Sequence, residues 1–299
     1  MIDIEKVYHW YIKTQNEANR EKYEEYDGWL SASSAGQCHR KQWYKTYKYD
    51  ERPIERDSAR KMRLGTVVHE DILEKAIPTY LIMHGSLPGV ENWTVYIEDR
   101  IELPDVKVVG HLDLVSINPD MGSAILSDFK TVHSYKWRKM FGHIKNRDKN
   151  PSINYELQLG TYALGVKRKY DVDTVEMNIV WYNKDTSTMR TTRIQKAYQT
   201  EALNYWTNLK ETIEEEDYDK VYKFKSLVPG TWNSPINEWE CNYCQFNHIC
   251  KSPFITKKGV SSENAKSKGT SLKDKRRASA DKGSTSSGGG SLPEAQKSK

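Results

Sequence analysis

The stretch Gly110–Thr131, GHLDLVSINPDMGSAILSDFKT, carries two runs of alternating apolar residues separated by NPDMGS. Alternation with a period of two is typical of half-buried strands, and Asn, Pro, Asp and Gly favour a turn between them. The stretch therefore predicts a β-hairpin, with Asp113 on its first arm and Asp128 on its second. Lys130 follows Asp128 by two residues, so both side chains project from the same face of the second arm.

The patterns on both sides of the hairpin predict further helices and strands. Helical spacing or alternation is found at 3–26 (helix), 57–77 (helix), 93–103 (strand), 152–170 (helix), 174–183 (strand), 188–195 (strand) and 198–217 (helix). Another helix is expected after SASSAGQ, with Ser31, Ser33 or Ser34 as its N-cap, and Gly65 would let the 57–77 helix pack closely on a strand. This order predicts an α/β fold in which helices flank a mixed central sheet.

Charge and composition separate a tail from the rest of the 299 residues. Residues 1–250 hold 34 Lys/Arg against 37 Asp/Glu, whereas residues 251–299 hold twelve against four. The tail has almost no large apolar side chain, so it cannot bury enough surface to offset the entropy of ordering. We expect a disordered basic tail over 256–299, which either contacts nucleic-acid phosphates or serves only solubility. The other expected parts are an N-terminal helical segment (1–56), a core (57–220) and a cysteine segment (221–255).

Several classes of protein are excluded by what the sequence lacks. No apolar run approaches the roughly 20 residues needed to span a bilayer. The amino terminus has no secretory pattern, and four cysteines are too few for a disulfide scaffold, so we expect a cytoplasmic protein. No GxxxxGK[ST] motif occurs, so any helicase or ATPase partner would be a separate chain.

The acids and the lysine of the hairpin suggest a metal site. Two carboxylates and an ammonium at the end of an apolar strand are unfavourable unless something compensates, and Mg²⁺ or Mn²⁺ prefers such oxygen ligands. Such an ion makes bound water easier to deprotonate and neutralises charge on a scissile phosphate, while Lys130 could orient the water or stabilise the transition state. The alternative is a structural Asp–Lys pair. His69, on the 57–77 helix, is either a further ligand or an ordinary helical histidine.

Gln158 and Tyr162 lie four residues apart, on one face of the 152–170 helix. They could hold the DNA backbone or position Lys130 by hydrogen bonding, or else face solvent on an amphipathic helix. Taken in order, Gly-His, GhxD, (D/E)xK and QxxxY resemble the RecB-type branch of the PD-(D/E)XK nucleases. The matching residues are His69, Asp113, Asp128, Lys130, Gln158 and Tyr162.

This resemblance implies a restriction-endonuclease-like fold and metal-dependent cleavage of phosphodiester bonds in DNA. Asp113, Asp128 and Lys130 would be catalytic, and the metal would be held by His69, Asp113, Asp128 and the backbone carbonyl of Phe129. Gln158 and Tyr162 would position the substrate. Glu70 and Asp71, beside His69, could exchange roles with it.

The four cysteines form one remote residue and a C-terminal trio. Cys241, Cys244 and Cys250 lie in CNYCQFNHIC, and Cys38 stands about two hundred residues earlier. Four thiolates can hold zinc or an iron–sulfur cluster. The spacing resembles the iron–sulfur nucleases, including the CRISPR-associated exonucleases, AddB and phage-encoded relatives, and this resemblance implies a structural 4Fe–4S cluster that joins the two ends of the domain. Zinc, with His248 as a possible ligand, and unligated thiols are the alternatives.

The segment HSYKWRKMFGHIKNRDKN, which begins three residues after Lys130, mixes aromatic and basic residues. Such a mixture can track a nucleic-acid strand by phosphate pairing and base stacking. We therefore predict DNA contacts from Lys136, Arg138 and Lys139. The alternative is that aromatic side chains of this kind, including Trp43 and Tyr44, fill the core while the lysines coat a helix. No helix-turn-helix or zinc-finger pattern points to base-specific reading.

These features together predict a metal-dependent DNA exonuclease acting in repair, recombination, replication or phage genome metabolism. Two alternatives remain from the sequence: an endonuclease directed to flaps or branches, and a catalytically silent DNA-binding accessory protein of the same fold. A phage-encoded version would work in the cytoplasm of the host.

Overall fold

The computed structural model describes residues 2–21, 28–143, 145, 153–215 and 238–250. The chain divides into two units, Met1–Thr256 and Lys257–Lys299, and the second lies wholly outside the described residues, as does the predicted basic tail. Within the described residues, no helix is both long and apolar enough to cross a membrane.

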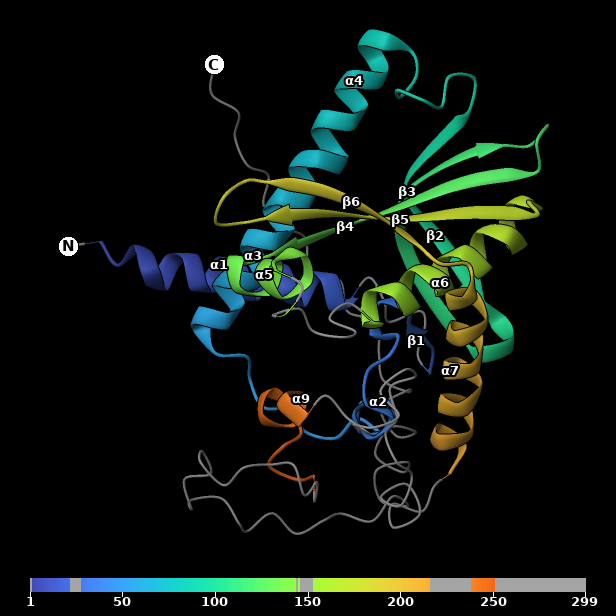
Figure 1. Cartoon of the computed structure of the whole chain (residues 1–299). Helices are drawn as coiled ribbons and strands as arrows, with labels where there is room; N and C mark the ends of the chain where they lie inside the picture. The colour runs from blue at the N-terminus through green and yellow to red at the C-terminus, as the bar shows by residue number, and fades with distance from the viewer. Residues whose placement is uncertain (1, 22–27, 144, 146–152, 216–237, 251–299) are drawn as a thin grey trace, which may run out of the picture. The chain divides into compact units, whose positions relative to one another are not determined.

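The first unit is a mixed sheet flanked by helices (Figure 1). Its strands are β1 (Leu30–Ser31), β2 (Thr94–Leu103), β3 (Val108–Asn118), β4 (Ser123–Val132), β5 (Thr174–Asn183) and β6 (Met189–Ile194). Its helices are α1 (Ile4–Glu21), α2 (His39–Thr46), α3 (Arg56–Glu70), α4 (Ile77–His84), α5 (Ser134–Phe141), α6 (Ile153–Tyr170), α7 (Ala197–Glu214) and α9 (Glu238–Tyr243). The α/β class and the predicted order of elements are confirmed.

The strand order of the sheet is β1-β3-β4-β5-β6, and β2 pairs with the other edge of β3. β3 and β4 are antiparallel and joined by a short turn, so the predicted hairpin is confirmed. β4 and β5 are parallel because the chain crosses over through α6 between them. β1 runs parallel to the first residues of β3, where β4 does not reach.

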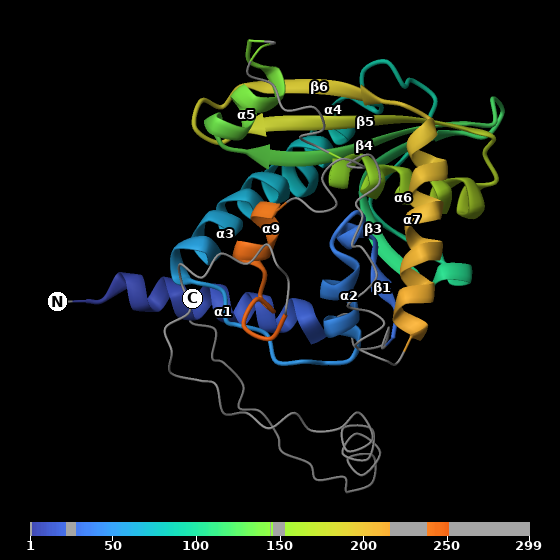
Figure 2. The ribbon, with the colours of Figure 1, turned by 60° about the horizontal axis from the view of Figure 1, so that its bottom comes forward.

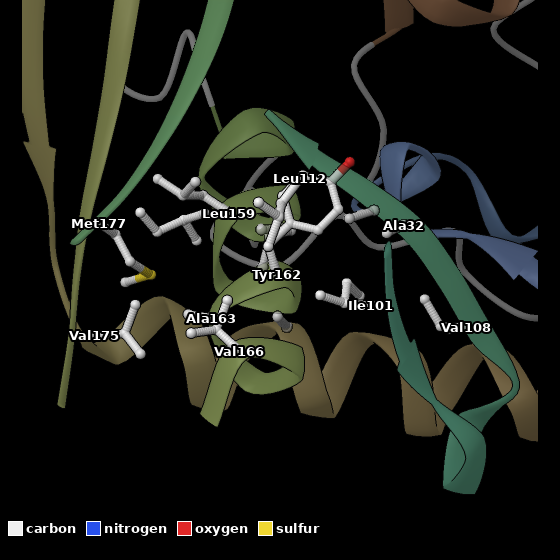
Figure 3. Packing of buried hydrophobic residues seen from close by; sticks show 14 of the residues in the cluster. Ala32, Ile101, Val108, Leu112, Leu159, Tyr162, Ala163, Val166, Val175 and Met177 are labelled. Carbon is white, nitrogen blue, oxygen red and sulfur yellow. The ribbon is translucent and has the colours of Figure 1, made fainter. Parts of the chain in front are cut away.

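The main core lies between the sheet and α6, which α7 covers in turn (Figure 2). Leu157 of α6 is fully buried. Leu159, Ala163 and Val166 of the same helix are also fully buried, in one core with strand residues such as Met177 (Figure 3). Burial of such side chains stabilises the fold by about 1.5–3 kcal/mol each. This packing fixes α6 across β2 to β5, next to the end of β4 that carries Lys130.

The helix that carries His69 is longer than the sequence indicates. After α3 the chain continues through a π-helical turn, η3 (Asp71–Ala76), directly into α4. The pattern predicts a helix over 57–77, whereas the helical chain continues past Pro78, which has no N–H to donate, to His84. A π turn shifts the hydrogen-bond register by one residue, and this lets the helix pass the proline.

A second, smaller core joins the two ends of the unit. Trp43, Tyr44 and Phe246 are buried together, with Cys244 and Cys250 packed against them. The Nε1–H of Trp43 also donates a hydrogen bond to the carbonyl of Glu215 at 2.9 Å. Trp43 and Tyr44 therefore fill a core, which agrees with the second interpretation of these aromatic residues.

The prediction that a serine caps the helix after SASSAGQ is wrong. The N-cap of α2 is Cys38, whereas Ser31 precedes a short 3₁₀ turn, η2 (Ala32–Ser34), without a capping side-chain bond. The serines instead contact one another: Ser31 and Ser33 hydroxyls lie 2.8 Å apart, and the Ser34 hydroxyl donates to the Ser31 carbonyl. These contacts lie within the turn that precedes α2.

β3 changes the face that it presents to the core halfway along. Val108 and Leu112 belong to the main core, and so do Val115 and Ile117. In a regular strand these two pairs would point to opposite sides, because side chains alternate. The change falls at Asp113, and opposite it on β2 stands Glu98, whose φ of +50° is the left-handed conformation that few non-glycine residues adopt.

Candidate active site

Asp113, Asp128 and Lys130 meet at the centre of the sheet. The backbone N–H of Phe129 donates to Asp113 Oδ2 at 2.6 Å, which fixes the Asp113 carboxylate against β4. The ammonium of Lys130 lies 2.9 Å from Asp128 Oδ1, to which it donates, and 2.7 Å from Oδ2. Asp128 is fully buried, and both of its carboxylate oxygens lie within 3 Å of the Lys130 ammonium. The two acids and the lysine therefore face one small volume.

His69 reaches the same place from α3. Its Nε2 lies 3.1 Å from Asp113 Oδ1. The other oxygen of this carboxylate, Oδ2, accepts the hydrogen bond from Phe129. The helix can approach β4 closely because a Cβ on Gly65 would lie only 2.7 Å from the hydroxyl oxygen of Thr131. The predicted role of this glycine in close packing agrees with that contact. Glu70 instead pairs with Arg63, at 2.7 Å, and so faces away from the acids.

Glu98 is a member of this site that the sequence did not indicate. Its Oε1 lies 3.6 Å from Nδ1 of His69, and ligand atoms of His69, Glu98 and Asp113 all lie within 4.8 Å of one another. One signal was present: alternation on the predicted strand breaks at the consecutive charged residues Glu98, Asp99 and Arg100. A break of this kind marks a place where a strand is distorted.

The charges of the site perturb one another. Burial raises the pKa of Asp128 to about 7, against the attraction of Lys130 and with a further rise from Asp113. Burial would lower the pKa of Lys130, but the charges of Asp128 and Asp113 outweigh it and hold that pKa above its usual value. Burial likewise opposes the charged form of His69, and the bond to Asp113 and the Glu98 charge reverse this to raise its pKa. The pKa of Glu98 is raised by burial and by Asp113.

Tyr155, on the first turn of α6, also contacts Lys130. The Lys130 ammonium lies 5.6 Å from the centre of the Tyr155 ring. The ammonium of Lys136, a residue of α5, lies 4.5 Å from the same ring centre. Lys136 also donates to the Tyr155 hydroxyl at 3.4 Å. Tyr155 packs edge-on against Trp181, so its ring is held by the core while it faces two cations.

The basic residues predicted to contact DNA lie on α5, which follows β4 directly. Arg138 is exposed, whereas Lys136 and Lys139 are half-buried, with the Lys139 ammonium 5.9 Å from the ring of Tyr135. The N-cap of the helix is His133, whose ring accepts a hydrogen bond from the Lys136 N–H. All three cations therefore lie within one and a half turns of the strand end that carries Lys130; their contact with DNA stays a prediction.

Gln158 and Tyr162 are both buried rather than facing solvent. The Gln158 amide donates to the Tyr162 hydroxyl at 2.9 Å. The Tyr162 ring lies against Gly110, where a Cβ would be only 3.0 Å from the ring. The pair therefore joins α6 to β3 in this state of the protein, and its predicted role toward the substrate stays a prediction.

A profile of the PD-(D/E)XK nuclease superfamily matches residues 32–251 of the chain. The chain belongs to this superfamily. The matched range contains His69, the hairpin and α6. The mixed sheet flanked by helices agrees with the restriction-endonuclease-like fold of the superfamily.

Some solved structures are similar to the chain at low identity. SSO0001 is 18% identical, with 82% of this chain and 96% of that chain covered and a TM-score of 0.43. An alkaline exonuclease from Laribacter hongkongensis is 16% identical, with 65% and 94% covered and a TM-score of 0.39. A phage-related exonuclease from Haemophilus somnus 129PT is 13% identical, with 58% and 76% covered and a TM-score of 0.34. None of the curated proteins matches the chain significantly.

In this member of the superfamily, three of the four cysteines, Cys38, Cys244 and Cys250, come together from both ends of the unit. Cys38 caps α2, Cys241 lies on α9, and Cys244 and Cys250 follow α9. Burial raises the pKa of the Cys244 thiol, and the nearby thiols of Cys38 and Cys250 raise it further, against the backbone N–H of Phe246 and the charge of Lys41. All four are free of disulfide bonds.

Two hydrogen bonds hold the C-terminal cysteine segment in place. The Arg52 N–H donates to the Gln245 carbonyl at 3.0 Å. The side chain of Asn154, at the start of α6, donates to Glu240 on α9 at 3.3 Å. The segment is therefore attached both to the chain that precedes α3 and to the helix that carries Tyr155.

The buried carboxyl of Asp128 makes stability depend on pH. Its pKa is 3.8 in an exposed carboxyl and about 7 here, so between these values the folded state keeps a proton that the unfolded chain has lost. We expect the stability contributed by this proton to be present below pH 4 and to be lost as the pH rises through 7. If the site holds a divalent cation, that ion competes with the proton, so Mg²⁺ should raise the melting temperature more at pH 8 than at pH 6. Thermal melts with Mg²⁺ or EDTA at pH 6 and pH 8 measure the rise in melting temperature that Mg²⁺ causes at each pH. An equal rise at both pH values would contradict the expectation.

Proposed function

We propose that this nuclease-superfamily protein is a divalent-cation-dependent DNA exonuclease. The observation that carries the proposal is the fully buried Asp128, which shares one small volume with Asp113 and Lys130. Burying two carboxylates together is costly unless a cation or a proton compensates them. Oxygen ligands of this type suit Mg²⁺ or Mn²⁺, and the donor set of the site therefore fits such an ion.

Asp113, Asp128, His69 and the backbone carbonyl of Phe129 would hold the cation, which supplies Lewis-acid stabilisation of the scissile phosphate. Phe129 fixes the orientation of Asp113 through its N–H, at 2.6 Å from Oδ2. Lys130 would face the water or the phosphate oxygen on which charge develops. Its ammonium is already oriented by Asp128 and by the Tyr155 ring, so little reorganisation is needed.

The DNA would enter from the more exposed side of the site. The exposed fraction of the side chain rises from 0% at Asp128 to 9% at Asp113, 29% at His69 and 42% at Glu98. Lys136, Arg138 and Lys139 on α5 would hold the phosphate backbone near the end of β4, and Gln158 with Tyr162 would support the substrate from α6. Aromatic side chains among these cations suit a single strand.

The four cysteines would hold a 4Fe–4S cluster, with zinc as the alternative. The support is the gathering of Cys38, Cys244 and Cys250 on the small core of Trp43, Tyr44 and Phe246. A cluster there would join the N-terminal and C-terminal segments and stabilise the fold. Anaerobic purification tests it: a brown protein with visible absorbance and stoichiometric iron supports the cluster, and a colourless protein with one zinc per chain rejects it.

The activity itself is tested with end-labelled linear DNA and with covalently closed circular DNA, in Mg²⁺ or Mn²⁺. An exonuclease shortens the linear DNA stepwise from one end and leaves the circle intact. Cleavage of the circle or excision of a flap would favour the endonuclease. Binding of DNA without cleavage in either metal would favour the accessory protein and overturn the proposal. Ladders from 5′-labelled and 3′-labelled substrates give the polarity.

A further inference from the structure

We propose that Tyr155 is a positioning residue of the proposed nuclease, whose ring holds the Lys130 ammonium in place once a cation binds the Asp128 carboxylate. The inference rests on the proposed function, because it assumes a cation at Asp128 and DNA beside α5. It goes beyond that function by assigning a role to a residue outside the sequence motif. Tyr155 would act through Lys130 and Lys136 and would touch no reacting atom.

Lys130 needs a second partner when a cation occupies the site. Its ammonium lies 2.9 Å from Asp128 Oδ1 and 2.7 Å from Oδ2, so the oxygens that would bind the cation also hold the lysine. Two positive charges at one carboxylate repel each other, and the doubly charged ion attracts the oxygens more strongly. The Lys130 side chain is only 18% exposed, so water cannot fully replace the carboxylate. The required partner attracts an ammonium without offering a ligand to the cation.

The ring of Tyr155 is such a partner. The Lys130 ammonium lies 5.6 Å from the ring centre, within the roughly 6 Å over which a ring face attracts a cation. Among the described residues, Asp128 and Tyr155 are the two that contact this ammonium by an ion pair, a hydrogen bond or a ring face. The carboxylate would be shared with the divalent ion, whereas that ion prefers oxygen ligands to a ring face. Lys130 would therefore move toward the ring when the cation binds.

The Tyr155 ring is held by the strands that carry the site. It packs edge-on against Trp181, with ring centres 5.6 Å apart and an angle of 67° between the planes. Trp181 is buried and stands opposite Lys130 in the parallel pairing of β4 and β5. Its Nε1–H donates a hydrogen bond to the Thr192 hydroxyl on β6 at 2.8 Å. The sheet therefore sets the position of the ring relative to the Lys130 backbone, and the contact is organised before the reaction.

The hydroxyl of Tyr155 orients a second cation. Lys136 donates to this hydroxyl at 3.4 Å, and its ammonium lies 4.5 Å from the ring centre. Lys136 belongs to α5, the helix proposed to contact the DNA backbone. Tyr155 thus contacts Lys130 through its ring and Lys136 through its ring and hydroxyl. The two roles can be separated, because phenylalanine keeps the ring and removes the hydroxyl, whereas leucine removes both.

Steady-state cleavage of end-labelled DNA by the full-length protein tests the inference. Tyr155→Leu should lower kcat about 10–30-fold, the range that a desolvated contact between a cation and a ring provides. Tyr155→Phe should keep kcat within about twofold of the wild type and raise KM, because only the bond to Lys136 is lost. Tyr170→Leu is the matched control and should keep the wild-type kcat. Tyr170 ends the same helix, and its ring also faces a lysine, with the Lys169 ammonium 5.3 Å from the ring centre.

A double-mutant cycle separates positioning from packing. In the Lys130→Met protein the ring has no ammonium to hold, so adding Tyr155→Leu should lower kcat by less than about twofold. A tyrosine that only packs would cost the same factor in both backgrounds, and equal losses would overturn the inference. A fall in kcat with Tyr155→Phe as large as with Tyr155→Leu would also overturn it, because phenylalanine retains the ring.

Lysine NMR tests the same contact without cleavage. In protein labelled at the lysine ε-carbon, the Lys130 signal is identified by its loss in Lys130→Met. The ring current of Tyr155 should shift this signal further in saturating Mg²⁺ than in EDTA, and Tyr155→Leu should abolish the added shift. An Mg²⁺-insensitive Lys130 signal in a wild type that cleaves DNA overturns the inference alone, as does the same added shift in Tyr155→Leu. A wild type that cleaves no DNA in Mg²⁺ or Mn²⁺ removes the proposed function, and the inference with it.

Discussion

Asp128→Asn is expected to reduce DNA cleavage by about a thousandfold or more at saturating Mg²⁺, with the fold intact. The asparagine keeps the shape of the side chain but removes the charge that would hold the cation. Asp128 is fully buried, so the amide of the variant replaces a carboxylate that solvent does not reach. Losing a single well-placed electrostatic group in an active site commonly costs 10²–10³ in rate, and a lost ligand also weakens the metal.

The measurement is the initial rate of digestion of end-labelled DNA, together with thermal melts of both proteins. Asp120→Asn is the matched control, because Asp120 is an exposed carboxylate in the turn of the same hairpin and should keep wild-type activity. Wild-type cleavage by purified Asp128→Asn would contradict the proposed site. A melting temperature many degrees lower would mean that the loss reflects unfolding, and Asp128→Glu would then serve as the second variant.

The hairpin and its three charged residues could be predicted because their arrangement is local. The turn signal at 118–123 sets the register between its arms, and the two-residue period sets the common face of Asp128 and Lys130. The same local logic placed most helices and strands within a few residues. A hairpin register depends on a few adjacent residues, and these are fully visible in the sequence.

Glu98 and Tyr155 could not be predicted because their positions depend on long-range geometry. Glu98 reaches the site through the register of β2 against β3 and through a left-handed residue within the strand. Tyr155 reaches Lys130 because the main core orients α6 over the sheet. Strand alternation and helix periodicity give the face of an element but not its neighbours in space. His69 and the close approach at Gly65 were candidates from the sequence, but the contact of His69 with Asp113 depends on how the helix packs on the sheet.

The helix that continues through Pro78 shows a different limit. Proline within a helix interior costs about 3 kcal/mol, yet the helical chain continues past Pro78 to His84. The local preference was overridden by the π turn η3, which begins immediately after Glu70. π turns are uncommon and are frequent near functional sites, and here the turn follows His69 by two residues.

Lys130→Met is expected to lower kcat about 10²–10³-fold while leaving the cation bound. Methionine keeps the unbranched stem but removes the ammonium, which lies 2.7 Å from Asp128 Oδ2. Because Lys130 lowers the pKa of Asp128 at present, its loss should raise that pKa further. The cation must then compete with a more tightly held proton. The residual activity of the variant should therefore keep rising up to a higher pH than the wild-type activity does. The Mg²⁺ concentration that gives half of the maximal rate at pH 7 should also increase.

Lys136→Met provides the comparison, because the Lys136 ammonium lies 4.5 Å from the same Tyr155 ring but on α5. If Lys136 holds the DNA backbone, its loss should raise KM and weaken the salt dependence of binding, with little effect on kcat. Rates measured from pH 6 to pH 9 for the three proteins separate the two roles. A Lys130→Met enzyme with wild-type kcat and an unshifted pH profile would exclude Lys130 from the chemistry and leave it as a counter-ion for a buried acid.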